Sequence, residues 1–242
     1  MSSSMEHLER IAQEYHANAT VPDIHIENIC QEYLLEWLRA HVPAGAHVLE
    51  LGYGDGLVTA AMARHCARLT LIEGAESLVR SAAQLHPHVE CVHTLFEDFR
   101  PTTGFDVILA SHVLEHVNDP GAILNLMATW LSPQGKIIAI VPNRNSIHRQ
   151  LAVAMGLQPE LDTLSNRDHL VGHQRVYSMD GLVRDIEAAG LRVIETTGFF
   201  LKVLPNSMML DYSRELLWAL NVISPSLPSN LLANIAVIAD KR

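Results

Sequence analysis

The feature that most constrains the fold of this chain is the alternation, between residues 47 and 142, of short apolar runs with segments of helical spacing. The apolar runs have the length of strands: HVLEL at 47–51, RLTLIE at 68–73, HVECVHT at 88–94, FDVILAS at 105–111 and KIIAIVP at 136–142. Helical spacing lies between most of them, over 56–66, 76–85 and 119–131. Strands separated by helices are joined by crossover connections. The pattern therefore predicts an α/β fold with a mostly parallel sheet covered by helices on both faces.

The two ends of the chain extend this pattern. Residues 1–41 show helical spacing, as in ICQEYLLEWLRAHV, and predict one or two helices before the first strand. The runs at 191–198 and 230–241 have the pattern of two further strands, the last of them antiparallel, which makes a seven-stranded sheet. Residues 199–229 between them are apolar and bounded by prolines, and a connection of roughly 30 residues is too long for a turn. We expect this segment to form a helical lid at the sheet edge or over a pocket.

Charge and composition exclude several classes of function. The formal net charge of −10, with 17 basic residues scattered along the chain, is unfavourable for a nucleic-acid partner. The N-terminal MSSSMEHLERIAQEY lacks the apolar region of a signal peptide, and no run approaches the roughly 18–20 apolar residues that span a bilayer. We therefore expect a cytoplasmic protein without a membrane partner. Cys30, Cys66 and Cys91 follow no disulfide or zinc pattern and are expected to be reduced.

The first strand leads into the stretch ELGYGDG, which places Gly52, Gly54 and Gly56 at alternate positions. In an open α/β sheet this turn lies beyond the carboxyl ends of the strands, where glycines let the backbone approach a ligand. Glycines at a tight turn can also serve only to allow positive φ. Glu73 ends the second strand about twenty residues further on, where a carboxylate can accept hydrogen bonds from a ribose diol. Together these features favour a ligand that contains a nucleoside.

The loop differs from the G-x-G-x-x-G of dinucleotide-binding proteins, because Glu50 precedes the first glycine by two positions. The run from Glu50 to Gly56 resembles the E-x-G-x-G-x-G signature of class I S-adenosylmethionine-dependent methyltransferases. The similarity continues in register through Glu73, LFEDF at 95–99, FDVILASHVLEHVNDP at 105–120 and LSPQGKIIAIVPN at 131–143. It implies a Rossmann-like methyltransferase fold and one domain over 1–242. Within that domain we expect an N-terminal helical cover (1–44), a cofactor-binding core (45–143) and a substrate-side half (144–242).

The resemblance also implies a role for each position of these motifs. The glycines of the loop would line the amino acid and ribose of S-adenosylmethionine, and Glu73 would hold the ribose hydroxyls. Glu97 or Asp98 would face the adenine amino group, and Ser111 and His112 would lie beside the methionine. The full predicted cofactor-binding set is Tyr15, Glu50, Gly52, Gly54, Gly56, Glu73, Gly74, Glu97, Asp98, Ser111 and His112.

Residues for the chemistry are harder to place, because reaction at a sulfonium needs mainly an aligned nucleophile and the transfer of one proton. VPNRNSIHRQLAVAMG (141–156) and DHLVGHQRVYSMDGLVRDIEAAG (168–190) resemble segments of a bacterial branch of the family. On this basis we predict Asn143, Tyr177 and His173 as catalytic candidates, against turn, packing or hydrogen-bonding roles for the same residues. His112 and His116 have i, i+4 spacing, but no third ligand is patterned, so we predict no metal site.

Three functions stay open at this point. The first is methyl transfer from S-adenosylmethionine to a small-molecule amine, hydroxyl or carboxylate in a biosynthetic pathway. The second follows a similarity in length and apolar cap to bacterial azetidine-2-carboxylate synthases, which cyclise S-adenosylmethionine as their sole substrate and release methylthioadenosine. The third is a non-catalytic module that binds the cofactor, or a partner through the apolar segment 199–223. A homodimer formed through that segment is compatible with all three.

Overall fold

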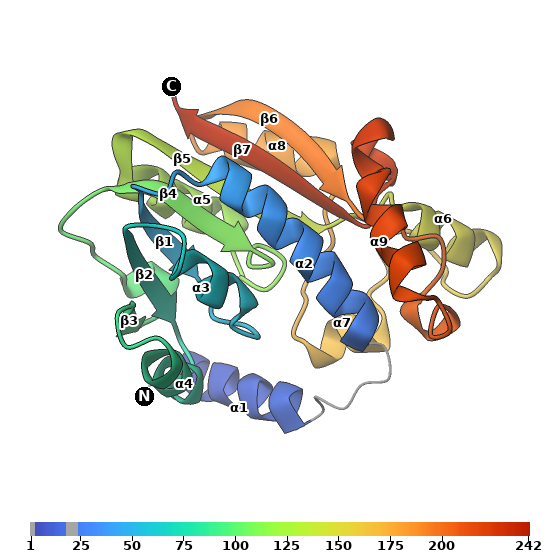
Figure 1. Ribbon diagram of the computed structural model, residues 1–242, viewed down its shortest axis with the longest axis horizontal. Coiled ribbons are helices and arrows are strands. Elements are labelled where there is room, and N and C mark those ends of the chain that lie inside the picture. The colour runs from blue at the N-terminus through green and yellow to red at the C-terminus, as the bar shows by residue number, and fades with distance from the viewer. Residues whose placement is uncertain (1–2, 18–23) are drawn as a thin grey trace.

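The computed structural model describes the backbone of residues 3–17 and 24–242, and the side chains of residues 5–13, 25–165 and 168–242. Its centre is a seven-stranded sheet in the order β3-β2-β1-β4-β5-β7-β6 (Figure 1). The strands are β1 (His47–Leu51), β2 (Arg68–Glu73), β3 (Glu90–His93), β4 (Phe105–Ser111), β5 (Leu131–Pro142), β6 (Leu191–Phe199) and β7 (Asn234–Lys241). The prediction of an α/β fold with a seven-stranded, mostly parallel sheet is confirmed.

The pairing of the strands determines where a ligand can bind. β1 pairs in parallel with both β2 and β4, so that Leu49 lies opposite Thr70 on one side and Ile108 on the other. β7 runs antiparallel between β5 and β6. The order of the chain through the sheet reverses between β1 and β4, and the loops that follow these two strands therefore diverge. Such a reversal opens a crevice at the carboxyl ends of the strands, where α/β proteins bind their ligands.

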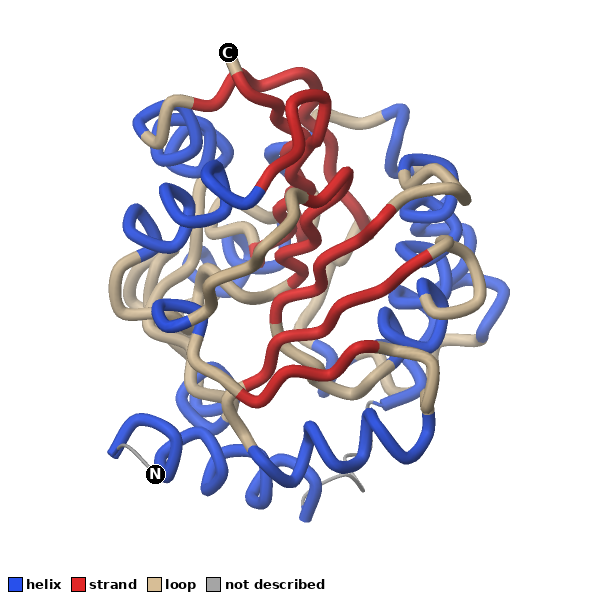
Figure 2. The backbone as a smooth tube through the Cα atoms, turned by 90° about the vertical axis from the view of Figure 1, so that its left-hand side faces the viewer, coloured by secondary structure: helices blue, strands red, loops and turns tan. Residues whose placement is uncertain are grey.

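Helices cover both faces of the sheet (Figure 2). The α-helices are α1 (Ser3–Ala17), α2 (Ile24–His41), α3 (Leu57–Met62), α4 (Glu76–Leu85), α5 (Pro120–Trp130), α6 (Ile147–Ala154), α7 (Asn166–Leu170), α8 (Met179–Ala188) and α9 (Arg214–Val222). α2, α3 and α4 pack on one face through Leu38, Met62 and Ala82. α5 and α8 pack on the other face through Leu124 and Ile186. The central strands are consequently buried on both sides, which explains their continuous apolar runs.

Three of these helices begin at a residue that the sequence supplies as a cap. The side chain of Asp119 accepts a hydrogen bond from the backbone N–H of Ala122, and Pro120 occupies the first turn of α5. Ser178 and Ser213 cap α8 and α9 in the same way. These side chains satisfy backbone donors that a helix start leaves unpaired.

The N-terminal region forms two helices, as its spacing predicts. α2 belongs to the packed face of the sheet, and its Trp37 ring meets the ring of Phe199 edge-on, with 5.1 Å between centroids. α1 lies against α4, and Glu9 accepts a hydrogen bond of 3.0 Å from the backbone N–H of Ser77 in the first turn of α4. α1 is thereby placed across the carboxyl ends of β1 and β2 (Figure 1).

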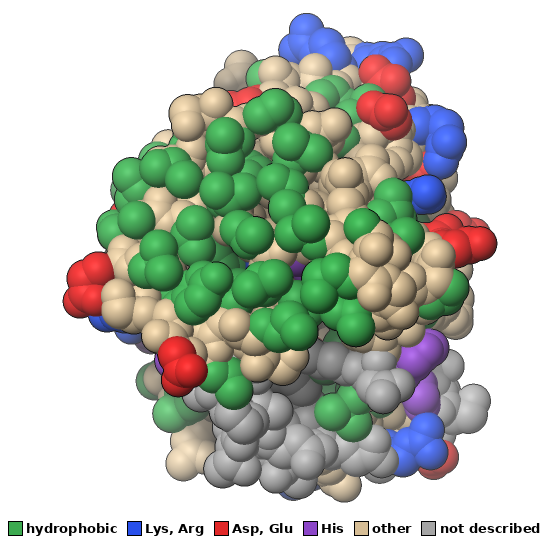
Figure 3. All heavy atoms as spheres, turned by 90° about the vertical axis from the view of Figure 1, so that its right-hand side faces the viewer, with side chains coloured by type: hydrophobic (Ala, Val, Ile, Leu, Met, Phe, Trp, Pro, Cys, Tyr) green, Lys and Arg blue, Asp and Glu red, His purple; other side chains and the backbone are tan. Residues whose placement is uncertain are grey.

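The segment 199–229 contains α9 together with two short 3-10 turns, η2 (Asn206–Met208) and η3 (Ser224–Ser226). It packs on α2, where the rings of Tyr33 and Trp218 meet edge-on with 5.7 Å between centroids. Its outer surface exposes hydrophobic side chains, which gather on the face drawn in Figure 3. Those of this segment are Met208, Leu210, Leu216, Val222 and Ile223. The segment thus forms helix as expected, with an apolar face turned to solvent.

Several predicted boundaries differ from the structure, and among the strands the largest differences are at β5 and β7. β5 begins at Leu131 and not at Lys136, with a shift of register against β4 after Phe105. β7 begins at Asn234, because Ser229–Leu231 forms the 3-10 turn η4 and is therefore not extended. In both places local apolar content marks the strand without fixing its first paired residue, which depends on the neighbouring strand. Among the described helices, none has the length and the apolar character required to cross a membrane.

Candidate functional site

A cavity of about 1200 Å³ opens at the carboxyl ends of the strands, where the topology predicts a ligand. Its walls come from the loops after β1, β2 and β4 on one side and from the segments around α1, α7 and η2 on the other. Ligand pockets usually measure about 300–1,000 Å³. This cavity can therefore hold a nucleoside-sized ligand together with a second small molecule.

The glycine loop after β1 forms one wall of the cavity. Gly52, Gly54 and Gly56 all have positive φ, of 75°, 54° and 77°, a conformation that other residues adopt only with strain. Gly52 and Gly54 line the cavity. Gly56 is not among the described lining residues, and a Cβ built on it would lie 2.5 Å from the ring of Tyr53. Gly56 therefore serves the packing of the loop, whereas the first two glycines leave backbone exposed to a ligand.

Two carboxylates flank this loop. Glu50 is buried behind it and accepts a hydrogen bond of 2.8 Å from the hydroxyl of Thr59, while burial raises the pKa of Glu50 to about 8. Glu73 ends β2 and accepts one backbone N–H on each oxygen, from Tyr53 at 2.9 Å and from Ala75 at 2.7 Å. Both residues line the cavity. The two backbone bonds fix the Glu73 carboxylate and leave each of its oxygens with a further lone pair for a ligand hydroxyl.

The part of the cavity wall that follows β3 combines exposed carboxylates with apolar side chains. Glu97 and Asp98 lie in the 3-10 turn η1 (Phe96–Asp98) and both line the cavity, next to Phe96. Gly74 lies nearby, and a Cβ on it would come within 2.5 Å of Leu8 in α1. α1 thus packs directly on the turn after β2. Tyr15 of the same helix is outside the residues whose side chains are described.

The loop after β4 carries Ser111 and His112 into the cavity. His112 has a φ of 56°, which is unusual for a residue other than glycine, and its Nδ1 donates to Oε1 of the fully buried Glu115 at 3.0 Å. Against the effect of burial, this bond and the charge of Glu115 raise the pKa of His112. A buried carboxylate paired in this way keeps its charge, and the pKa of Glu115 is correspondingly low.

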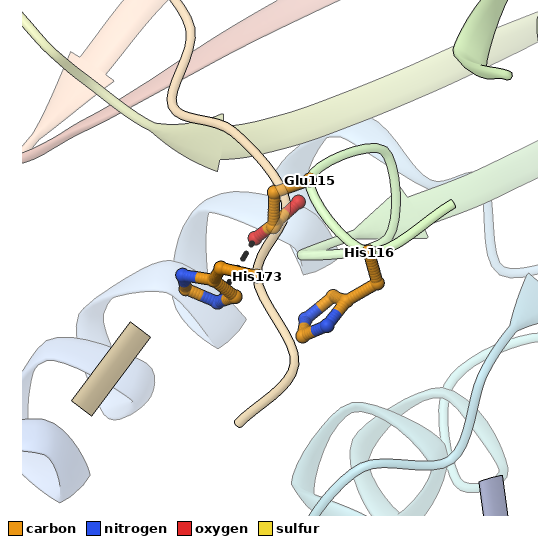
Figure 4. Close-up of side chains that lie close together, drawn as sticks. All are labelled: Glu115, His116 and His173. Carbon is orange, nitrogen blue, oxygen red and sulfur yellow. Dashed lines mark ion pairs between the residues drawn. The ribbon is translucent and has the colours of Figure 1, made fainter. Parts of the chain in front are cut away.

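Glu115 also faces two further histidines on the same wall (Figure 4). Nε2 of His173 lies 4.0 Å from Oε1 of Glu115, and the rings of His116 and His173 meet edge-on with 4.7 Å between centroids. One ligand atom from each of the three residues lies within 4.8 Å of the others, a set that could hold a divalent metal ion or pass a proton. The predicted absence of a metal stays a prediction.

The His173 side chain is held from behind by a buried carboxylate. Its Nδ1 donates to Asp168 at 2.8 Å, and Asp168 also accepts hydrogen bonds from Arg149 at 3.1 Å and from the hydroxyl of Ser165 at 2.7 Å. Against the cost of burial, these bonds keep the pKa of Asp168 well below its usual value. His173 is therefore oriented with Nε2 directed toward Glu115.

The structure gives two of the predicted catalytic residues other surroundings. Asn143 is buried after β5, where its amide donates to the carbonyls of Asn230 and Leu232, both at 2.8 Å, and accepts from the N–H of Asn145. Tyr177 packs in the core beneath α8 and borders a different, smaller pocket. Neither is among the described residues that line the main cavity. Of the three candidates, His173 is the one that belongs to the described lining of the main cavity.

The sequence interpretation missed several residues on the substrate side of the cavity. Asp168 lies five positions before His173, in the short helix α7, where no motif marks it, so that only the candidate histidine itself could have drawn attention to it. Phe200, Lys202 and Asn206 belong to the lid segment and line the cavity as well. No spacing pattern marks them, because they follow β6 in irregular structure.

Comparisons with known proteins show the family to which the chain belongs. The family model described as a methyltransferase domain matches residues 23–196. The ubiquinone biosynthesis O-methyltransferase of Coxiella burnetii is 30% identical over 179 residues, which are 71% of this chain and 73% of that protein. The protein of the same name from Aeromonas salmonicida is 28% identical over 189 residues, covering 75% and 77%.

Solved structures show the same fold at lower identity. A possible histamine N-methyltransferase from Thermotoga maritima superposes with a TM-score of 0.64 at 17% identity, covering 98% of this chain and 100% of the other. The magnesium protoporphyrin IX methyltransferase of Synechocystis, with bound S-adenosylhomocysteine, superposes with a TM-score of 0.58 at 14% identity, covering 90% and 84%.

Proposed function

Because the chain belongs to the class I S-adenosylmethionine-dependent methyltransferase family, we propose that it methylates a hydroxyl group of a small organic molecule. The protein is an enzyme, and S-adenosylmethionine is its methyl donor. The choice of a hydroxyl acceptor draws support from the O-methyltransferases among its relatives and from the histidine that faces the acceptor side of the cavity. Acceptors in a biosynthetic pathway fit the same set of relatives.

The residues of the first half of the cavity suit the cofactor. The bare backbone at Gly52 and Gly54 allows close approach, and the fixed carboxylate of Glu73 can take the two ribose hydroxyls. Glu97 or Asp98 would receive the adenine amino group, and the loop at Ser111 would border the methionine. S-adenosylmethionine supplies a methyl group on a positively charged sulfur, and carboxylates around the cavity attract such a cation.

The observation that carries the acceptor proposal is the Asp168–His173 pair on the wall opposite the glycine loop. A hydroxyl nucleophile must lose its proton as it is methylated, and a histidine side chain is the usual acceptor of that proton. Asp168 fixes the tautomer of His173, because a carboxylate at Nδ1 leaves Nε2 as the free base. The charge on Asp168 would then stabilise the imidazolium that forms.

Other residues of this wall would control the environment of the proton transfer. Glu115 lies 4.0 Å from Nε2 of His173 and would add to the stabilisation of a protonated ring. The aliphatic side chains of Leu8 and Ile11 in α1, together with Phe200 of the lid segment, would exclude water from the space between the two ligands.

Cyclisation of S-adenosylmethionine to azetidine-2-carboxylate is the alternative that the same cofactor allows. Tyr177 and Asn143, two of the predicted catalytic residues, are not among the described residues that line the cavity. The relatives and solved structures named above are methyltransferases. We therefore do not favour cyclisation, and the assay below separates it from methyl transfer by its product.

The test is to incubate the enzyme with S-adenosylmethionine and a panel of phenols, catechols, alcohols, amines and carboxylates, and to separate the products by mass spectrometry. We expect acceptor-dependent S-adenosylhomocysteine with a methyl ether as co-product. Methylthioadenosine formed without any acceptor would instead establish cyclisation, and methylation of amines alone would contradict the choice of acceptor.

Once an acceptor has been identified, His173→Gln and Asp168→Asn test whether His173 is the general base. We expect His173→Gln to lower kcat by about 10²–10⁴-fold with unchanged cofactor affinity, because a general base contributes on that order. His169→Gln is the matched control, since His169 lies in α7 near the site, is exposed and is not among the described cavity residues. Retention of the wild-type rate and pH profile by His173→Gln would rule out this base.

A further inference from the structure

A second pocket, of about 300 Å³, lies on the other side of the segment that carries His173. The chain from 173 to 177 is its dividing wall: His173 and Gln174 line the main cavity, whereas Arg175 and Tyr177 line the second pocket. The backbone of Tyr177 is tied to the end of β5 by hydrogen bonds with Pro142 and Arg144. The second pocket therefore has its own walls and is separate from the cofactor site.

Positive charge is concentrated in this pocket. Arg144, Arg175 and Arg184 all line it, and the carboxylate among its lining residues is that of Asp185. Nε of Arg184 lies 3.6 Å from Asp185, and Arg144 lies 3.9 Å from Asp162, a residue outside the lining. Three guanidinium groups against one carboxylate contrast with a chain whose net charge is −10. Such a pocket favours an anion.

Two buried polar groups at the pocket have no partner within the described part of the chain. They are the hydroxyl of Tyr177, a residue that is only 6% exposed, and Nε of Arg144. Arg175, in contrast, is held by the carbonyls of Leu114 and Val117. A buried donor without an acceptor costs free energy, and native proteins usually satisfy such groups with protein, water or a ligand. Both orphaned groups can donate to an oxyanion.

The N-terminus of α8 completes the pocket. Ser178 caps this ten-residue helix by accepting from the N–H of Gly181 at 3.1 Å. A Cβ built on Gly181 would lie 3.1 Å from the hydroxyl oxygen of Ser178 and 3.8 Å from a terminal nitrogen of Arg184. Gly181 thus keeps this narrow surface clear of a side chain, beside a hydroxyl, a guanidinium and a helix N-terminus, a combination that binds phosphate groups.

We propose that this arginine pocket, lined by Arg144, Arg175, Tyr177, Ser178, Gly181 and Arg184, is a binding site for an oxyanion of the phosphate class, either inorganic phosphate or the phosphate of a small monoester. Arg144 and Arg184 supply the charge-assisted donors, Arg175 adds its positive charge, and Tyr177 supplies a neutral donor. The proposal does not depend on the methyl acceptor, because the site lies outside the cavity in which the reaction takes place.

The test is a titration of the full-length enzyme with inorganic phosphate and with glycerol 3-phosphate, at constant ionic strength adjusted with chloride, followed by calorimetry and by the unfolding temperature. We expect saturable binding of one anion per chain for at least one of the two ligands. The ligand that binds more tightly shows whether the site prefers inorganic phosphate or a phosphate monoester. Arg184→Gln should weaken that binding about tenfold or more, because it removes a charged donor. Arg184 is largely exposed, so this change should leave folding intact.

Gly181→Ala provides a second and independent variant. Alanine is favoured over glycine in a helix, which offsets the 3.1 Å contact of the new methyl group with the hydroxyl of Ser178. Unfolding in urea should therefore show a folded α8, while the methyl group weakens phosphate binding. Arg39→Gln, an exposed change on α2 with the same loss of charge, is the control and should bind as the wild type does. Non-saturable stabilisation that is equal in all four proteins, or no binding of either ligand to the wild type, would overturn the proposal.

Discussion

The carboxylate of Glu73 offers the sharpest test of the cofactor half of the site, through Glu73→Gln. In the structure each oxygen of Glu73 accepts one backbone N–H, from Tyr53 at 2.9 Å and from Ala75 at 2.7 Å. Glutamine keeps the shape of the side chain but has one acceptor oxygen, so that its amide group would face one of these two N–H donors. A buried donor left unpaired costs about 1–3 kcal/mol, and we expect the free energy of unfolding to fall by that amount.

Glu73→Gln should also weaken the binding of the cofactor, separately from its effect on stability. A hydrogen bond from a ribose hydroxyl to a charged carboxylate contributes about 1.5–3 kcal/mol, which corresponds to a loss of about 10–150-fold in affinity. The assay is calorimetric titration of the variant with S-adenosylmethionine and with S-adenosylhomocysteine. Both ligands carry the same ribose, so we expect the same fold-loss for both.

Glu187→Gln is the control for the change of charge, because Glu187 is exposed on α8 and is not among the described cavity residues. It should bind both ligands as the wild type does. A loss for Glu73→Gln that is confined to the positively charged S-adenosylmethionine would mean that Glu73 acts by long-range attraction. A folded Glu73→Gln with wild-type affinity for both ligands would refute the ribose contact.

Two further predictions concern the glycine loop and the carboxylate behind it. Gly56→Ala should lower the free energy of unfolding in urea by about 2–4 kcal/mol, since it combines a strained φ with a clash against Tyr53. Gly45→Ala is the control and should change this free energy little, because nothing lies within 4 Å of the new Cβ. Equal effects of the two changes would contradict the packing of Gly56 against Tyr53. Burial raises the pKa of Glu50 to about 8, so the native state keeps this proton as pH rises from about 4.5, and stability falls across that window. Glu50→Gln, measured without cofactor, should become progressively more stable than the wild type from pH 5 to 8, by up to about 1.4 kcal/mol per pH unit, and parallel curves would show that Glu50 is ionised.

The sequence by itself determined the sheet, the edge of the sheet at which the cavity opens and the half of the cavity that we assign to the cofactor. Strand-like runs separated by helical segments lead to parallel pairing, and the observed order β3-β2-β1-β4-β5-β7-β6 follows that pattern. Gly52, Gly54 and Glu73 were recognisable because they stand at the ends of the first two strands, where chain direction alone brings them to one edge of the sheet. The short-range rules of strands, turns and caps suffice for these residues.

Only the tertiary structure decided which residues of the second half face the cavity. His173 meets Glu115 and is held by Asp168 because the segment that follows α7 packs against the turn after β4, and no periodicity records such contacts. In the stretch from 173 to 177 neighbouring residues face different pockets, so a sequence motif that contains both His173 and Tyr177 could not tell which of them reaches the substrate. Packing across long separations in sequence, and not local chemistry, fixes the direction of each of these side chains.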